Sequence, residues 1–349
     1  MKSSHILQRM CLAGIMVLLL TGCSKADYEQ EPSEQEENKI QIGMIFDNFV
    51  MERWQRDRDV FVSTAKEMGA EVNVQNANGS VEEQIELINY FIKKKVDVIV
   101  IVPIDSAPLL SAVSKAQEEG IKVISYDRLI IGAKPDLYIS FDNEKVGRLM
   151  AEALAGKMEA GDGVLMINGS ITDNNVKEVE TGFKEVMQQK HIRILGVYYA
   201  DDWKPEYAAS YIRQNSNLLE NVQGIMCGND NLAGQAISAL AEQRLAGEIL
   251  VVGQDADLAA CQRIVEGTQY MTVYKSIEKL AAGAAQAAVA LAENTEFAYE
   301  YYETEEGDEI PYIKLEPVAV NADNMQDVII DSGFQLKEDV YLYRPDLLE

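Results

Sequence analysis

The chain has 349 residues, of which 47% are hydrophobic and 25% charged, and its 31 basic against 57 acidic residues give a formal net charge of −26. This length corresponds to about two domains, at roughly 150 residues each, and the composition excludes disordered, collagen-like and multi-span membrane proteins. So strong an acidic excess repels phosphate backbones and argues against nucleic acid as the main partner.

Residues 1–22 are predicted to be a secretory signal peptide. Lys2 and Arg9 supply its positive region, and residues 10–20 form an apolar stretch too short to span a bilayer. The sequence Leu-Thr-Gly-Cys ending at Cys23 resembles the lipobox of bacterial lipoproteins, which makes Cys23 the predicted lipid attachment site. The alternative is a simple secreted protein in which this cysteine is incidental.

Residues 23–39 are predicted to be a lipid-anchored tether. After Cys23 the segment is rich in Glu, Gln and Ser and has no apolar periodicity, so it cannot bury enough surface to become ordered. We expect it to hold a folded body at the outer face of the cell membrane.

From residue 40 onward, short β-branched apolar runs alternate with longer amphipathic stretches, which is the pattern of an α/β protein. Several runs, such as Val98–Val102, are apolar without alternation, as strands are when helices cover both faces of a parallel sheet. Ten strands are predicted, at residues 40–46, 71–75, 97–102, 122–126, 137–141, 163–168, 192–199, 223–227, 249–253 and 271–274. Two doubly wound lobes with five strands each are the simplest arrangement.

Polar residues gather directly after these strands. They are Asp47-Asn48, Asp105, Asp127-Arg128 and Asp142-Asn143 in the first half, and Asp201-Asp202, Asn229-Asp230, Asp255 and Lys275 in the second. Ligands of open α/β sheets bind beyond the carboxyl ends of the strands, so two facing lobes would enclose a polar cleft. Carboxylates, amides, Arg and Lys together suit a neutral ligand with many hydroxyl groups.

The two tryptophans, Trp54 and Trp203, each stand at the start of a helix after a strand end, one in each half. Aromatic rings bury the flat C–H faces of sugars, so a sandwich with one ring from each lobe is predicted. A core position is the alternative for Trp54, because apolar residues follow it at helical spacing. Asp57 and Arg58 interrupt that stripe, and we favour the cleft.

Catalytic and cofactor motifs are missing from the sequence. Only His5, in the signal peptide, and His191 are present, and no G-x-S-x-G elbow, P-loop or G-x-G-x-x-G occurs. We therefore expect no catalytic residue, no metal site and no cofactor. Cys227 and Cys261 lie in or beside apolar segments, which predicts two buried free thiols, with a disulfide as the alternative.

Several long segments carry a family resemblance. They lie at residues 51–59, 76–79, 120–128, 138–147, 173–175, 253–259 and 267–275. Together they span nearly the whole body of the chain and resemble the bacterial sugar-binding proteins of ABC importers, within that family its D-xylose-binding members. The resemblance implies a type I periplasmic-binding-protein fold with about three hinge crossings, near Asp142, Lys275 and Glu316.

These crossings set the expected bounds of the lobes. The N-terminal lobe is expected to comprise residues 40–142 and 276–316, and the C-terminal lobe residues 143–275 and 317–349.

The resemblance also assigns ten sugar contacts. They are Arg53, Trp54, Asp127, Arg128, Asp173, Asn175, Trp203, Asn229, Asp255 and Lys275. Arg and Lys donate hydrogen bonds to hydroxyl groups, carboxylates accept them, Asn does both and the two rings stack. Taken alone, Asp173 or Asp255 is equally well explained as a helix N-cap.

The function implied is that of a receptor that binds a monosaccharide, D-xylose, and delivers it to an ABC importer, with no enzymatic activity. A glycosidase would need a glycosidic bond, and a related repressor would need a helix-turn-helix where the signal peptide lies. The open alternative is a sensor subunit that presents the same sugar to a membrane histidine kinase. Two segments depart from the family, Asp202–Lys204 and Glu300–Pro311, and the second, with its paired tyrosines and five Glu, leaves the partner open.

Overall fold

The computed structural model describes residues 39–49, 53–304 and 306–348. The predicted signal peptide, Cys23 and nearly all of the predicted tether lie outside these residues. Within them, no helix is long and apolar enough to cross a membrane.

The first of two sheets has seven strands in the order β11-β12-β5-β4-β3-β1-β2. Its strands are β1 (Gln41–Phe46), β2 (Glu71–Asn76), β3 (Val98–Ile101), β4 (Lys122–Tyr126), β5 (Leu137–Phe141), β11 (Glu300–Glu303) and β12 (Glu309–Leu315). All of its pairs are parallel except β11–β12 at the edge. We call the lobe built on this sheet the N-terminal lobe.

The second sheet has six strands in the order β13-β10-β9-β8-β6-β7. Its strands are β6 (Gly163–Asn168), β7 (Arg193–Tyr199), β8 (Gly224–Cys227), β9 (Leu250–Gln254), β10 (Met271–Tyr274) and β13 (Val318–Val320). Only the edge pair β10–β13 is antiparallel. This sheet forms the C-terminal lobe.

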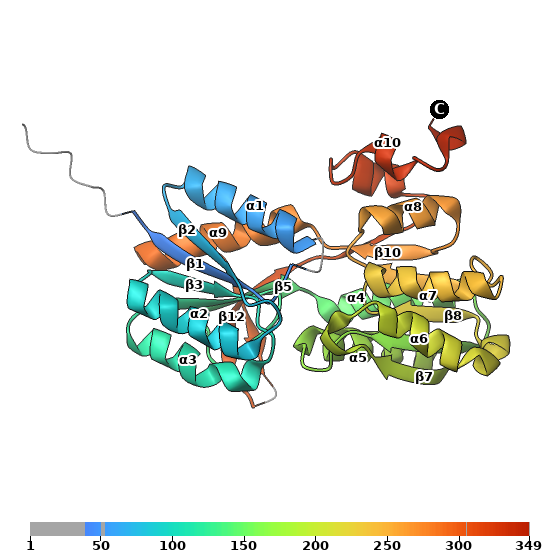
Figure 1. Ribbon diagram of the computed structural model, residues 1–349, viewed down its shortest axis with the longest axis horizontal. Helices are drawn as coiled ribbons and strands as arrows, with labels where there is room; N and C mark the ends of the chain where they lie inside the picture. The colour runs from blue at the N-terminus through green and yellow to red at the C-terminus, as the bar shows by residue number, and fades with distance from the viewer. Residues whose placement is uncertain (1–38, 50–52, 305, 349) are drawn as a thin grey trace, which may run out of the picture. The chain divides into compact units, whose positions relative to one another are not determined.

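Helices cover both faces of each sheet, so the prediction of two doubly wound lobes is confirmed. On the first sheet, α1 (Arg53–Glu67) and α9 (Ile277–Glu293) share one face, although they are far apart in sequence, and α2 (Val81–Lys94) and α3 (Ser106–Glu118) share the other (Figure 1). Apolar side chains fill the space between sheet and helices on each face.

The second sheet repeats this arrangement. Its faces are covered by α4 (Asn143–Ala155) with α5 (Asn174–Gln189), and by α6 (Glu206–Gln214) with α7 (Asp230–Glu242). The helix α8 (Leu258–Glu266) and the short α10 (Lys337–Val340) pack together in a further apolar cluster.

The prediction of five strands per lobe was wrong. The ten predicted strands correspond to β1–β10, but the described residues contain three more: β12 and the edge strand β11 lie beyond β5, and the edge strand β13 lies beyond β10. These strands lack the continuous apolar run that marks a buried strand: β11 is mostly exposed, β12 alternates, and β13 has only three residues. Glu300–Pro311, which departs from the family pattern, forms most of a hairpin.

Within the residues that the structure describes, the chain passes between the sheets three times, between β5 and β6, between β10 and α9, and between β12 and β13. The predicted hinge of about three crossings is thereby confirmed, while the exact lobe bounds stay a prediction. Cys227 and Cys261 are buried and free, as expected.

Two glycines bring α4 and α5 into backbone contact. A Cβ atom at Gly182 would lie 2.0 Å from the Glu144 carbonyl oxygen, and one at Gly147 would lie 2.0 Å from that of Val179. Because no side chain separates the two helices at these points, the middle of α5 is held firmly beside the start of α4, next to the crossing from β5.

Candidate functional site

The candidate site lies where the carboxyl ends of the strands meet. Asp127 and Arg128 follow β4, Asn229 follows β8, and Asp255 and Lys275 follow β9 and β10. Nine of the ten predicted sugar contacts are buried, with exposed fractions between 1% and 8%, and Trp203 is half-buried. Burial of so many charged groups is costly unless they are paired, and the structure shows how they are.

Arg53, at the start of α1, connects carboxylates from both lobes. Its Nη2 lies 3.1 Å from Asp127 Oδ2 in its own lobe, and its Nη1 lies 3.5 Å from Asp255 Oδ1 in the C-terminal lobe. The Lys275 Nζ completes the group at 2.9 Å from Asp255 Oδ1. These four predicted residues therefore form one charged cluster that spans the two sheets.

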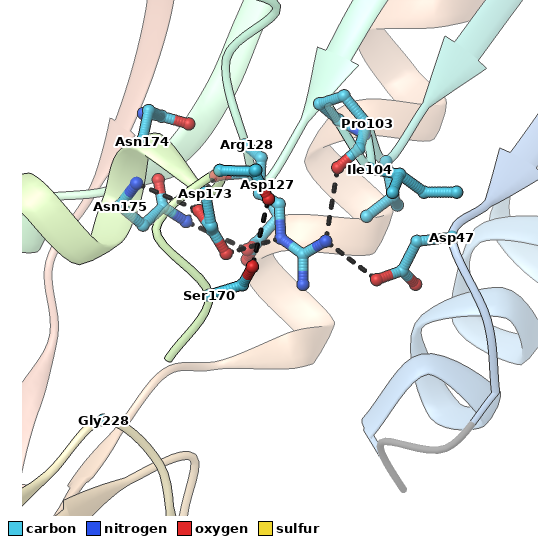
Figure 2. A network of polar contacts seen from close by, with 12 residues as sticks. Asp47, Pro103, Ile104, Asp127, Arg128, Ser170, Asp173, Asn174, Asn175 and Gly228 are labelled. Atoms are coloured by element: carbon cyan, nitrogen blue, oxygen red, sulfur yellow. Dashed lines mark hydrogen bonds and ion pairs between the residues drawn. The ribbon is translucent and has the colours of Figure 1, made fainter. Parts of the chain in front are cut away.

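Arg128 makes a second connection between the lobes (Figure 2). Its Nη1 donates to Asp47 Oδ2 at 2.8 Å and to the Pro103 carbonyl oxygen at 3.2 Å. Its Nε forms an ion pair with Asp173 Oδ2 at 2.7 Å, across the cleft. Burial raises the pKa of Asp173 although Arg128 opposes this effect.

Asn175, a predicted sugar contact close to Arg128 and Asp173, lies against Asp127 (Figure 2). Its Nδ2 donates to the Asp127 carbonyl oxygen at 3.0 Å and to Oδ1 at 3.2 Å, while its Oδ1 accepts from Asn143 Nδ2 at 3.0 Å. The donor on Asn143 thus fixes which end of the Asn175 amide faces Asp127.

Two site carboxylates stand on strained backbone. Asp127 has a φ of 64° and Asp255 a φ of 102°, values that residues with a Cβ adopt at a cost of roughly 1–3 kcal/mol. At Asp127 the Ser140 hydroxyl supports the strained peptide by donating to its carbonyl oxygen at 2.6 Å. Such strain is typical of residues whose side chains are aimed at a ligand.

The charge state of the cluster follows from its pairing. Burial by itself raises the pKa of Asp127, but the positive charges of Arg53, Lys275 and Arg128 together hold it below its usual value. The carboxylate therefore stays ionised and is a strong acceptor for a hydroxyl group.

Asp57 supports Arg53 from behind. It is fully buried, its Oδ2 accepts from Arg53 Nε at 3.4 Å, and its Oδ1 accepts from the Tyr126 hydroxyl. Burial raises the pKa of Asp57 to about 6, against the lowering effect of Arg53. The sequence analysis treated Asp57 only as an interruption of an apolar stripe, although its spacing of four residues from Arg53 already places both on one helix face.

Trp54 belongs to both the core and the site. Its ring packs in the apolar cluster of the N-terminal lobe, 6.0 Å from Phe46, and lies under the guanidinium groups of Arg53 at 4.5 Å and Arg128 at 5.7 Å. The two interpretations of Trp54 are thus compatible, since the ring packs in the apolar cluster and also contacts two guanidinium groups of the charged site.

Trp203 rests on two glycines that the sequence analysis did not consider. A Cβ atom at Gly169 would lie 2.2 Å from the Trp203 ring, and one at Gly228 would lie 3.2 Å from it. The ring also packs against apolar clusters of both lobes. The Nε1 groups of both tryptophans are buried without a hydrogen-bond partner among the described residues.

Most of the ten predicted sugar contacts lie against one another. Eight of the ten residues are linked to one another by ion pairs, hydrogen bonds or ring contacts, and Trp203 and Asn229 lie outside these links. Asn229 caps α7 by accepting from the Leu232 N–H, and Asp173 caps α5 in the same way. Asp255 caps no helix, because Asp257 precedes α8.

The fold and this cleft define a class of protein. Residues 42–296 match the family model described as periplasmic binding protein domain, and the chain belongs to that family. Its relatives include D-xylose-binding periplasmic proteins of Haemophilus influenzae, 42% identical over 86% of this chain and 92% of that one, and of Escherichia coli, 40% identical over 97% and 100%. The resemblance to this family, drawn from the sequence, is confirmed.

Solved structures agree with the fold. A carbohydrate transporter solute-binding protein from Chloroflexus aurantiacus, crystallised with D-glucose, superposes with a TM-score of 0.79 at 26% identity, covering 86% of this chain and 98% of that one. The matched family and relatives are binding proteins, so the expectation that this chain is not an enzyme is also confirmed.

Proposed function

We propose that the chain is an extracytoplasmic receptor that binds one monosaccharide, D-xylose, between its two lobes. The observation that carries the proposal is the cluster in which Arg53 faces Asp127 of one lobe and Asp255 of the other, with Lys275 beside it. The names of the D-xylose-binding relatives support the choice of sugar.

The ten predicted contacts have different roles in sugar binding, which follow from the chemistry of their side chains. Arg53, Arg128 and Lys275 donate to sugar oxygens, and the three aspartates accept in charge-assisted bonds. The two amides do both, and the two indole rings cover the faces of the sugar ring. Each hydroxyl group that enters the cluster exchanges a contact between protein charges for one with the sugar.

Binding in this position favours closed lobes. The sugar contacts both lobes only when they are together, so it shifts the population from open to closed forms about the three crossings. A pentose has about ten non-hydrogen atoms, and micromolar binding corresponds to a free energy of about −8.2 kcal/mol. Each atom would then contribute roughly 0.8 kcal/mol, which is below the limit per atom for small ligands.

A panel of sugars tests the function. D-xylose should raise the unfolding temperature of the purified protein more than L-arabinose, D-ribose, D-glucose and D-galactose at equal concentration, because a ligand that binds only the folded state stabilises it. A protein whose unfolding temperature responds to none of the five sugars would show that the cleft serves another ligand.

We further propose that Cys23 carries a lipid and that the receptor delivers its sugar to an ABC importer from the outer face of the cell membrane. Cells expressing the full chain should incorporate labelled palmitate into it and retain it in the membrane fraction. The variant Cys23→Ala should lose both properties, whereas Cys227→Ala should keep them, because that thiol is buried inside the C-terminal lobe. Label in the Cys23→Ala protein would contradict the anchor.

A sensor role is the second candidate, and the β11–β12 hairpin favours it. This hairpin presents the exposed rings of Tyr299 and Tyr301 at a free sheet edge, which is a surface suited to a partner. Co-purification with a membrane histidine kinase, and not with an importer permease, would favour the sensor.

A further inference from the structure

The β11–β12 hairpin reaches beyond its own lobe. It lies at the edge of the seven-stranded sheet, where β12 pairs with β5 and β11 pairs with β12. Tyr301 points outward and is 57% exposed, whereas the neighbouring Tyr302 is half-buried. The Tyr302 hydroxyl donates to Glu178 Oε1 at 2.8 Å, and Glu178 belongs to α5 of the C-terminal lobe.

The Tyr302 ring is held in place for this contact. It meets Tyr138 edge-on, with ring centroids 5.5 Å apart, and Tyr312 edge-on at 5.6 Å. Tyr138 and Tyr312 themselves stack at 4.7 Å. Three packed rings leave the Tyr302 hydroxyl little freedom, so the hydrogen bond to Glu178 costs little side-chain entropy.

Glu178 continues toward the sugar site. Its second oxygen, Oε2, accepts from Asn143 Nδ2 at 3.0 Å, and the same nitrogen donates to Asn175 Oδ1 at 3.0 Å. Asn175 in turn donates to Asp127. A continuous line of hydrogen bonds therefore runs from the hairpin through Glu178 and Asn143 to two predicted sugar contacts.

A separate contact joins the lobes in the same region. The Leu129 N–H, just after Arg128, donates to Asn174 Oδ1 at 2.8 Å, and Asn174 is the first residue of α5. Neither this hydrogen bond nor the Tyr302–Glu178 bond involves any of the ten predicted sugar contacts.

We propose that the β11–β12 hairpin is a latch that holds the lobes together outside the sugar site, with Tyr302, Glu178 and Asn143 as positioning residues for sugar binding. The latch stabilises the closed form and fixes the Asn175 amide with its nitrogen toward Asp127. It rests on the proposed function, because it takes closure around a sugar as the event that it controls.

The test removes one hydroxyl group. Tyr302→Phe keeps the packed ring but loses the hydrogen bond to Glu178, and Tyr301→Phe is the matched control on the same strand. We expect Tyr302→Phe to weaken D-xylose binding about five- to tenfold, mainly through faster dissociation, since a hydrogen bond to a charged group is lost from the closed form only. Its unfolding temperature without sugar should stay close to that of the control.

A double-mutant cycle distinguishes positioning from general structural damage. Glu178→Gln alone should also speed dissociation of D-xylose, but adding it to Tyr302→Phe should change the rate less than the product of the two single effects. Independent, fully multiplicative effects would show that the two residues do not act as one latch.

Small-angle X-ray scattering separates failure of the latch from failure of the proposed function. Without sugar, Tyr302→Phe should have a larger radius of gyration than the wild type. If the wild type binds no D-xylose but this expansion is seen, the proposed function is wrong and the latch stands. If the wild type binds D-xylose and Tyr302→Phe matches it in both dissociation rate and radius, the latch is wrong and the function stands.

Discussion

Replacing Arg53 by Met should strongly weaken sugar binding and lower the free energy of unfolding by about 3–5 kcal/mol at pH 8, because removing one partner of a buried ion pair leaves the other charges uncompensated. Asp57, Asp127 and Asp255 all lose their contact with the guanidinium group. The sugar loses two charged donors, each worth roughly 1.5–3 kcal/mol, so D-xylose affinity should fall at least a hundredfold.

The pH dependence of stability in this variant should show that the buried carboxyl groups cause the loss. Asp57 already has a pKa of about 6 against an ordinary value of 3.8, so the folded state binds a proton on this carboxyl group more tightly than the unfolded state does. The stabilisation that results is fully present below about pH 4 and is lost as the pH rises through 6. Without Arg53 the buried carboxyl groups favour the protonated form still more. The stability deficit of Arg53→Met relative to wild type should therefore be larger at pH 8 than at pH 5.

Chemical denaturation at the two pH values measures this deficit. The control is Arg58→Met on the same helix, because Arg58 pairs with the exposed Asp59 and such pairs contribute roughly 0–1 kcal/mol. An Arg53→Met protein as stable as the control at both pH values would contradict the role given to the cluster.

Gly169→Ala should weaken D-xylose binding about ten- to hundredfold, roughly 1.4–2.8 kcal/mol, although no side chain at residue 169 is expected to contact the sugar. The added Cβ atom would lie 2.2 Å from the Trp203 ring, which must move away from its place beside the cleft. The sugar then loses one of its two stacking surfaces.

Isothermal titration of Gly169→Ala with D-xylose measures the loss, and Gly283→Ala provides the control. At Gly283, within α9, a Cβ atom would meet only Ile139 at 3.4 Å, an ordinary contact, and alanine is the better helix former. Wild-type affinity in Gly169→Ala would mean that the position of Trp203 does not matter for binding.

The fold was largely predictable from the sequence because its central strands are apolar throughout. Val98–Ile101 is fully buried by helices on both faces and leaves little ambiguity. The edge strands were missed for the opposite reason. β11 has an exposed face and, among the described strands, pairs with β12 alone, so its residues resemble those of a polar loop.

The sequence indicated residues that gather at the strand ends, but it did not indicate the residues that support them. Residues after strand ends converge in any doubly wound fold, and the family resemblance assigned their roles. Their supports come from distant parts of the chain. Asp47 contacts Arg128 across 81 residues, and Tyr302 contacts Glu178 across 124, and no local pattern in the sequence indicates such a pairing.

Isothermal titration of D-xylose into the wild-type protein and into Trp203→Ala tests the central claim most directly. The wild type should bind one D-xylose per chain at micromolar or tighter affinity, and Trp203→Ala should bind it at least tenfold more weakly while remaining folded. Wild-type protein that releases no heat with D-xylose at any temperature tried, or a Trp203→Ala protein with unchanged affinity, would contradict a sugar site between the two lobes.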